Sequence, residues 1–192
     1  MPKDIEIEIQ VEVEKIKPLL VFLEKEAKFI STNKQVDKYF TPKHRNFLKN
    51  KPIAEWLRLR DSDGNFSITY KNWHYDKNGK SHYCDEFETN VSDIKSLNKI
   101  FSALDFKLLI TVDKLRKTFN YKSYEIAIDK VKGLGDFVEI EFKSKTKKSD
   151  PAKVTEEMIE FLKKIGVGKI NRNYVGYPFM ILYPDKVKYE EF

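Results

Sequence analysis

Residues 5–15 read IEIEIQVEVEK, a strict alternation of aliphatic and polar positions. Because successive side chains of a strand point to opposite faces, this alternation predicts a β-strand over 4–14 with one apolar face. The opposite face is a row of glutamates in which Gln10 is the one neutral residue. Like charges on one face repel each other, so a strand that simply faces water rarely carries such a row. The row of acids is therefore a feature that the fold has to explain.

Similar alternation, interrupted by turn signals and helical patterns, continues along the chain. It predicts further strands over 36–40, 54–60, 66–71, 83–91, 106–121, 124–129 and 137–145. Helical spacing of apolar residues predicts three helices, which begin at Pro18, Ser92 and Asp150, and the first is expected over 18–30. About eight strands and three helices in this order predict an α+β fold on a mainly antiparallel sheet. Residues 1–192 are expected to form a single domain.

The composition narrows the class of protein. Hydrophobic residues make up 41% and aromatic residues 14% of the chain, which is enough for a buried core and excludes a disordered chain. The formal net charge of +6 favours anionic partners and fits phosphate-rich small molecules as well as nucleic acid. His44, His74 and His82 have no metal-like spacing with Cys84, which argues against zinc. The lone cysteine, the absence of an apolar run of about 20 residues and the lack of a signal-peptide pattern predict a cytoplasmic protein without a membrane partner.

The charged faces of the predicted strands are grouped by sign. Paired acids occur at 6 and 8, at 86 and 88, and at 139 and 141, whereas paired bases occur at 58 and 60 and at 114 and 116. Two interpretations are open at this point. In the first, the sheet packs its apolar face on the core and turns its charged face to water. In the second, the strands close into a barrel with the charged faces inward, where carboxylates hold Mg²⁺ and basic side chains bind a polyphosphate.

The ordered set of motifs resembles one known family. The segments EIEIQ (6–10), VDKYF, WLRLR, SITYK, DEFE, VDKLR, IAIDKVKGLGDFVEIEF and RNY (172–174) occur in the order found in the CYTH superfamily, also called triphosphate tunnel metalloenzymes. The family includes class IV adenylyl cyclases and thiamine triphosphatases, and the stretch DKVKGLGDFVEIE is most similar to the class IV branch. The resemblance spans residues 5 to about 174. It implies an eight-stranded antiparallel β-barrel that forms a tunnel, with flanking helices.

The resemblance also implies a role for each charged pair. The implied ligands of Mg²⁺ or Mn²⁺ are Glu6, Glu8, Glu139, Glu141 and Glu88, with Glu86 as the alternative to Glu88. The implied phosphate-binding residues are Arg58, Arg60, Lys71, Lys114, Arg116 and Arg172, with Lys143 as a weaker candidate. Lys71 and Asp129 are implied as catalytic residues. Lys71 would orient the attacking water or the reacting oxygen, and Asp129 would support the metal site.

The chain departs from the family pattern at three positions. The family's first motif ends in Lys where this chain has Gln10, which removes one cationic contact near the metal site. Cys84 stands where the acid strand usually has Arg, and the late Ser-Tyr motif is replaced by Asn173-Tyr174. These departures bear on substrate choice and activity more than on the fold.

Three functions are compatible with the resemblance. The first is metal-dependent hydrolysis of a triphosphate, most simply inorganic tripolyphosphate or a nucleoside triphosphate, which needs only water and the shared site. The alternative is a class IV-type adenylyl cyclase, which would convert ATP to cyclic AMP and pyrophosphate and would need an adenine pocket. The third is a non-catalytic module that binds polyphosphate, nucleotide or RNA ends. We favour hydrolysis, with a triphosphate-containing small molecule as the partner in preference to nucleic acid, and a homodimer is left open.

Overall fold

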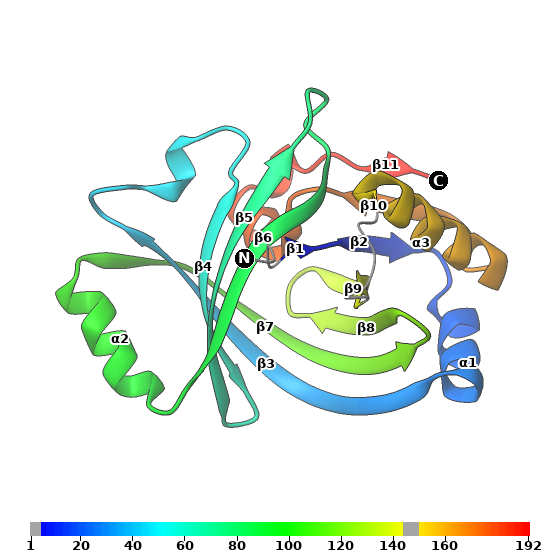
Figure 1. The fold of residues 1–192 in the computed structure, drawn as a ribbon, viewed down its shortest axis with the longest axis horizontal. Coiled ribbons are helices and arrows are strands. Elements are labelled where there is room, and N and C mark those ends of the chain that lie inside the picture. Colours follow the sequence, from blue (N-terminus) through cyan, green and yellow to red (C-terminus); the bar gives the residue numbers. More distant parts are fainter. Residues whose placement is uncertain (1–4, 144–149) are drawn as a thin grey trace.

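The computed structural model describes residues 5–143 and 150–192, which form an extended antiparallel sheet flanked by helices (Figure 1). The strands are β1 (Ile5–Glu6), β2 (Glu8–Val13), β3 (Lys28–Pro42), β4 (Glu55–Ser62), β5 (Asn65–Tyr75), β6 (Ser81–Val91), β7 (Phe106–Tyr121), β8 (Tyr124–Val131), β9 (Gly135–Phe142), β10 (Ile170–Asn173) and β11 (Glu190–Glu191). The α-helices are α1 (Ile16–Glu26), α2 (Ile94–Ala103), α3 (Pro151–Ile165) and α4 (Gly176–Leu182). The strand expected over 137–145 corresponds to β9, and positions 144 and 145 lie outside the described residues. None of the helices in the described part of the chain has the length and apolar character needed to cross a bilayer.

The strands follow the hydrogen-bonded order β1-β6-β5-β4-β3-β7-β8-β9-β2-β10-β11, and every neighbouring pair is antiparallel. This order confirms the predicted α+β class and antiparallel sheet. The finer expectation of a closed barrel of eight strands is not confirmed. The described residues form an 11-stranded sheet whose hydrogen-bonded order is open, with β1 at one end and β11 at the other.

The first predicted strand accounts for much of this difference. Its alternation continues over the expected residues, but strand pairing is interrupted at Ile7. β1 pairs with β6, whereas β2 pairs with β9, and the carbonyl of Ile7 accepts a hydrogen bond from the Phe142 backbone N–H at 2.9 Å. One continuous segment therefore contacts both β6 and β9, and the C-terminal β10 and β11 extend the sheet beyond β2. Alternation specifies the direction of side chains, but it does not specify which strands pair.

The boundary between α1 and β3 also differs from the expectation of one helix over 18–30. The helix begins at Ile16, two residues before Pro18, and it ends at Glu26. The strand β3 then begins at Lys28, because nearly its whole length pairs with β7, another long strand (Figure 1). Backbone pairing with a distant strand thus overrides the local helical pattern of the last residues.

The helices α1, α2 and α3 cover the apolar outer face of the curved sheet. α1 and α3 pack on β2, β8 and β9, and the fully buried members of this cluster include Ile9, Val11, Leu19, Leu23, Ile126, Ile140, Met158 and Leu162. Full burial of one such side chain stabilises the fold by about 2 kcal/mol relative to its exposure. α2 packs on the other end of the sheet through Phe101, which contacts Phe40 edge to face at 5.1 Å. The apolar positions of the first predicted strand therefore lie under helices, and its charged positions are on the opposite face.

Candidate functional site

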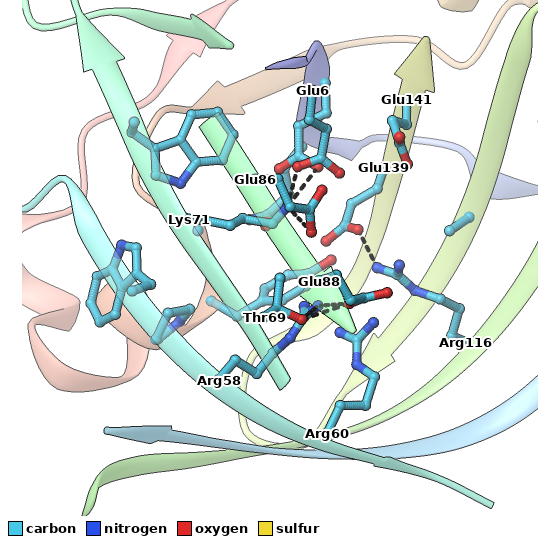
Figure 2. A pocket seen from close by; sticks show the side chains of 18 of the residues that line it. Glu6, Arg58, Arg60, Thr69, Lys71, Glu86, Glu88, Arg116, Glu139 and Glu141 are labelled. Carbon is cyan, nitrogen blue, oxygen red and sulfur yellow. Dashed lines mark hydrogen bonds and ion pairs between the residues drawn. The ribbon is translucent and has the colours of Figure 1, made fainter. Parts of the chain in front are cut away.

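The opposite, charged face of the sheet lines a cavity of about 220 Å³. Its walls include charged side chains from eight strands, several of which are labelled in Figure 2. Val175, Gly176, Tyr177 and Pro178, around the start of α4, also line it. Among the residues predicted from the sequence, those that line the cavity are Glu6, Glu8, Arg58, Arg60, Lys71, Glu88, Lys114, Arg116, Glu139 and Glu141. Glu86 and Lys143 line it as well. The charged faces thus line a cavity and are not turned to open water, which is the part of the second interpretation that the structure confirms.

The acidic wall consists of Glu6 on β1, Glu8 on β2, and Glu139 and Glu141 on β9, and β2 and β9 lie side by side. Glu8 pairs in register with Glu141, and Gln10 pairs with Glu139. Burial raises the pKa of Glu8 to about 7, and the negative charges of Glu6 and Glu139 add to the effect. Burial and the charge of Glu6 likewise raise the pKa of Glu141 to about 7. Ionisation of both Glu8 and Glu141 is therefore costly in the folded protein.

Basic side chains of the same cavity reach into this acidic wall. The ammonium group of Lys71 forms an ion pair with Glu6 and lies 3.4 Å from Glu8 Oε2 and 3.8 Å from Glu86 Oε1 (Figure 2). Arg116 Nη2 forms an ion pair with Glu139, and Lys143 Nζ lies 2.6 Å from Glu141 Oε2. In this structure, cations of the protein itself are thus the partners of Glu6, Glu139 and Glu141.

The basic wall consists of Arg58 and Arg60 on β4 and of Lys114 and Arg116 on β7. Arg58 Nη2 donates to Thr69 Oγ1 at 2.8 Å and to Glu88 Oε2 at 3.2 Å, and the Thr69 hydroxyl donates to the same Glu88 oxygen at 2.6 Å. Burial lowers the pKa of Lys114 to about 8, and the positive charge of Arg116 contributes to this shift. Several bases therefore lie close enough to repel each other, which suits a ligand with several negative charges.

Asp129 lies behind the basic wall and does not line the cavity. It is fully buried and accepts hydrogen bonds from Lys114 Nζ at 2.9 Å, from Arg116 Nε at 2.7 Å and from the Tyr177 hydroxyl at 2.9 Å. These contacts hold two bases in place. They differ from the expected direct catalytic or metal-supporting role, because the carboxylate has no access to the cavity.

Arg172 also lies outside the set of cavity-lining residues. It is 3% exposed, its Nη2 donates to the Ser81 carbonyl at 3.3 Å, and its guanidinium lies 4.4 Å from the centre of the Tyr174 ring. The sequence motif placed this residue in the phosphate-binding set. The fold places it on β10, next to β2, where it packs against an aromatic ring.

The chemistry of the acidic wall fits a divalent cation, although the side chains are not arranged around one. Glu6, Glu8, Glu139 and Glu141 supply hard oxygen ligands of the kind that Mg²⁺ and Mn²⁺ prefer. Burial and the neighbouring acids make ionisation of Glu8 costly, and a cation would lower this cost. Within the described residues, however, no group of three or more His, Cys, Asp or Glu side chains is arranged to hold a metal ion. The ion pairs with Lys71 and Arg116 explain this arrangement, because they draw the carboxylates towards the bases.

The three departures from the family pattern have distinct local contacts. Gln10 lines the cavity and its Nε2 donates to Met180 Sδ at 3.6 Å. Cys84 is buried opposite Glu6 in the β1–β6 pairing, and its thiol donates to Glu6 Oε2 at 3.3 Å. Burial raises the pKa of this thiol, so it remains protonated. The Asn173 side chain accepts from the backbone N–H groups of residues 175 and 176 at 3.2 Å each, which fixes the turn into α4.

Several contributors to the site were missed by sequence reasoning. Asp37 forms two hydrogen bonds of 2.7 Å with Arg60, and Tyr177 contacts Asp129 from the C-terminal segment. Trp56 also contributes aromatic surface to the cavity. Asp37 belongs to the segment VDKYF (36–40), one of the motifs of the resemblance, but this segment has no alternation, because Val36 and Lys38 flank the acid. No local pattern links Tyr177 to the cavity, because only the path of the chain brings it there.

Comparisons with known proteins agree with this geometry. The model of the CYTH domain matches residues 4–174. The Methanocaldococcus jannaschii protein "Putative adenylate cyclase MJ0240" is 38% identical over 168 residues, which cover 87% of this chain and 93% of that protein. The structure of the PH1819 protein of Pyrococcus horikoshii OT3 is similar, with a TM-score of 0.74, 24% identity, and coverage of 94% of this chain and 99% of the other. The Hippeastrum "Putative adenylyl cyclase HpAC1", described with a dominant triphosphatase activity, has a TM-score of 0.62 at 16% identity and covers 95% of this chain and 97% of its own.

Proposed function

Because the chain belongs to the CYTH domain family, we propose that it is a divalent-metal-dependent hydrolase that cleaves inorganic tripolyphosphate or a nucleoside triphosphate. The observation that carries this proposal is the cavity of about 220 Å³, in which a wall of carboxylates faces a wall of arginines and lysines. Such a pair of walls suits a polyphosphate that enters together with its metal ion.

The basic wall provides the proposed phosphate contacts. Arg58, Arg60 and Arg116 each offer a planar fork of N–H donors, and Lys114 adds a point charge. Their combined charge offsets the roughly four to five negative charges of a triphosphate, which is the main catalytic requirement of phosphoryl transfer. Asp129 positions Lys114 and Arg116 from behind and contacts no substrate.

The acidic wall provides the proposed metal ligands, which are Glu6, Glu8, Glu139 and Glu141, with Glu88 near the basic wall as a further candidate. A bound Mg²⁺ or Mn²⁺ would supply charge neutralisation and polarisation of the phosphate oxygens. When Glu6, Glu8 and Glu139 take up that role, Lys71 and Arg116 lose these partners and become available to phosphate, while Asp129 still holds Arg116. Lys71 is then placed to orient the attacking water.

Hydrolysis in this site needs no group beyond those already described. The water oxygen forms a bond to the terminal phosphorus, and the bridging P–O bond breaks with its electron pair remaining on the leaving oxygen. The proton lost by the water passes to the leaving phosphate group or to the solvent. With tripolyphosphate the products are orthophosphate and pyrophosphate. The side chains contribute by holding the phosphates in line and by stabilising the charge that develops on the leaving oxygen.

Adenylyl cyclase activity is the second candidate function. It is supported by the 38% identical relative, which carries the name of an adenylate cyclase. In that reaction the ribose 3′-oxygen attacks the α-phosphate of ATP and pyrophosphate leaves. The same walls would bind the phosphates, but recognition of the nucleoside would be an additional requirement. The Hippeastrum protein, which shares the fold, combines a cyclase-like name with triphosphatase activity, and this supports our preference for hydrolysis.

A single assay distinguishes these functions. The protein is incubated with Mg²⁺ or Mn²⁺ and either tripolyphosphate or ATP, and orthophosphate, pyrophosphate and cyclic AMP are measured. Release of orthophosphate with a requirement for the metal is the expected result. Cyclic AMP with equimolar pyrophosphate would replace the hydrolase by the cyclase, and binding of both ligands without turnover would indicate a non-catalytic module.

A matched pair of variants tests the assignment of the acidic wall. The double variant Glu6→Ala, Glu8→Ala should lose metal-dependent turnover while remaining folded. The control is Glu12→Ala, Glu14→Ala, which changes the same acidic row beyond the cavity. Full activity of the first variant would show that the metal assignment is wrong.

A further inference from the structure

Asp37 is buried beneath the basic wall and does not line the cavity. It lies on β3 directly opposite Arg60 on β4. Its Oδ1 accepts a hydrogen bond from Arg60 Nε at 2.7 Å, and its Oδ2 accepts one from Arg60 Nη2 at 2.7 Å. Two parallel bonds of this kind fix the plane of a guanidinium group as well as its position. Because Asp37 is only 1% exposed, water does not compete for these bonds.

The geometry leaves part of the Arg60 guanidinium for a ligand. A guanidinium has five N–H donors, and Asp37 engages donors along one edge only. Among the described residues, no other side chain accepts a hydrogen bond from Arg60. The guanidinium also lines the cavity, so its remaining N–H groups are the ones that a bound anion meets.

We propose that Asp37 is a positioning residue for phosphate recognition, which holds Arg60 in the orientation that a triphosphate requires. This inference rests on the proposed function, because it assumes a phosphate ligand in the cavity. Asp37 itself cannot act as a base or a metal ligand in this arrangement, since its carboxylate is sealed from the cavity by the side chains that it supports.

The charges around Asp37 show why the acid is needed. Arg58 Nη1 lies 4.0 Å from Asp37 Oδ2, and Lys114 also acts on the carboxylate through its positive charge. Burial alone would raise the pKa of Asp37, but Arg60 and Arg58 outweigh this effect and hold the pKa well below its usual range. The carboxylate therefore stays ionised and reduces the repulsion among these bases. Asp129 does the same for Arg116 on the neighbouring strand pair.

Two explanations of Asp37 make opposite predictions about ligand binding. If Asp37 acted only through its negative charge, it would weaken the attraction of the wall for anions, and its neutralisation would tighten binding. If Asp37 acts by holding Arg60, its neutralisation loosens the Arg60 guanidinium and weakens the binding of the anion. The sign of the change therefore identifies the role.

The test measures the affinity for tripolyphosphate in EDTA by isothermal titration calorimetry. We expect Asp37→Asn to weaken binding by about tenfold, which corresponds to the loss of one charge-assisted hydrogen bond. Arg60→Met should weaken binding at least as much. The double variant Asp37→Asn, Arg60→Met should bind no more weakly than Arg60→Met alone, because the effect of Asp37 passes through Arg60. Asp113→Asn, a change on β7 outside the cavity lining, is the control and should leave the affinity unchanged.

Tighter binding of tripolyphosphate by Asp37→Asn would overturn the proposal. The proposal would also be overturned if Asp37→Asn weakened this binding equally in the protein with Arg60 and in the Arg60→Met variant. If Asp37→Asn alone does not fold, the comparison of Arg60→Met with the double variant decides. A further loss of affinity in the double variant then overturns the proposal, and an equal or tighter affinity supports it. If the protein binds tripolyphosphate but does not hydrolyse it, the proposed hydrolase function is wrong, whereas the proposed role of Asp37 in phosphate binding still stands. If the protein hydrolyses tripolyphosphate but the effects of Asp37→Asn and Arg60→Met on affinity are additive, the proposed role of Asp37 is wrong and the hydrolase function stands.

Discussion

Glu8 on β2 lies directly opposite Glu141 on β9, and both carboxylates line the same cavity. Two acids in adjacent register positions of a sheet repel each other, and their burial increases the cost of ionising both. The pair thus stores an electrostatic strain that the protein relieves only in part, through Lys71 beside Glu8 and Lys143 beside Glu141.

This strain predicts how the metal-free protein responds to pH. In the unfolded chain, Glu8 and Glu141 ionise near 4.5, whereas in the folded protein burial and neighbouring acids raise each pKa to about 7. Between these values the folded state binds more protons, so these two groups stabilise it as the pH falls and destabilise it as the pH rises through 7. We expect Glu8→Gln to raise the melting temperature at pH 8 in EDTA and to flatten its pH dependence, measured by scanning calorimetry. Glu12→Gln on the same strand is the control, and a lower melting temperature of Glu8→Gln at pH 8 would contradict the prediction.

The contacts of Lys71 lead us to expect that its substitution raises the affinity for the metal ion and lowers the turnover. Its ammonium group is the internal cation for Glu6, Glu8 and Glu86, so it competes with a metal ion for the same oxygens. Lys71→Met should therefore bind Mn²⁺ several-fold more tightly without substrate, as measured by calorimetry or electron paramagnetic resonance. Its turnover of tripolyphosphate should fall by about 100-fold, because the orienting cation is lost. Lys38→Met, an exposed position on β3, should change neither quantity, and weaker Mn²⁺ binding by Lys71→Met would argue against competition.

Substitution of Asp129 should cause a large loss of stability. Its fully buried carboxylate is shared by Lys114, Arg116 and Tyr177. Asp129→Asn therefore removes the carboxylate bonded to Lys114 and one of the two bonded to Arg116, which also pairs with Glu139. Breaking a buried pair of this kind costs about 3 kcal/mol of unfolding free energy, which urea denaturation measures. The control is Asp136→Asn, an exposed residue of the same hairpin, for which a change within about 0.5 kcal/mol is expected. A similarly small effect at Asp129 would refute the supporting role.

Gln10 predicts a gain of anion affinity when the family's lysine is restored. Gln10 lines the cavity beside Glu8 and opposite Glu139, and its present partner is the weak acceptor Met180 Sδ. Gln10→Lys adds a positive charge to the cavity, so binding of tripolyphosphate in EDTA should tighten several-fold. Gln10→Met has a similar length without charge and serves as the control. Equal affinities of the two variants for tripolyphosphate would show that a charge at position 10 does not interact with the bound ligand.

The sequence by itself determined the faces of the strands and the chemical character of the site. Alternation in IEIEIQVEVEK and FVEIEF required the glutamates to share one face and the aliphatic residues the other, because side chains of a strand alternate. The structure then places Glu6, Glu8, Glu139 and Glu141 in one cavity, with their aliphatic neighbours under α1 and α3. The order of the motifs was specific enough to indicate the family before any geometry was known.

Only the tertiary structure decided which charges meet. Pairing between strands places Asp37 against Arg60 and Asp129 against Arg116, and the turn into α4 brings Tyr177 to Asp129. Arg172 belongs to the same set of motifs, yet the fold buries it beside Tyr174. The break at Ile7, which lets one segment contact both β6 and β9, is also a property of pairing. Side-chain alternation is a local property of the chain, whereas register and ion pairing depend on contacts between residues far apart in sequence, and the burial of charge that shifts the pKa values exists only once those contacts form.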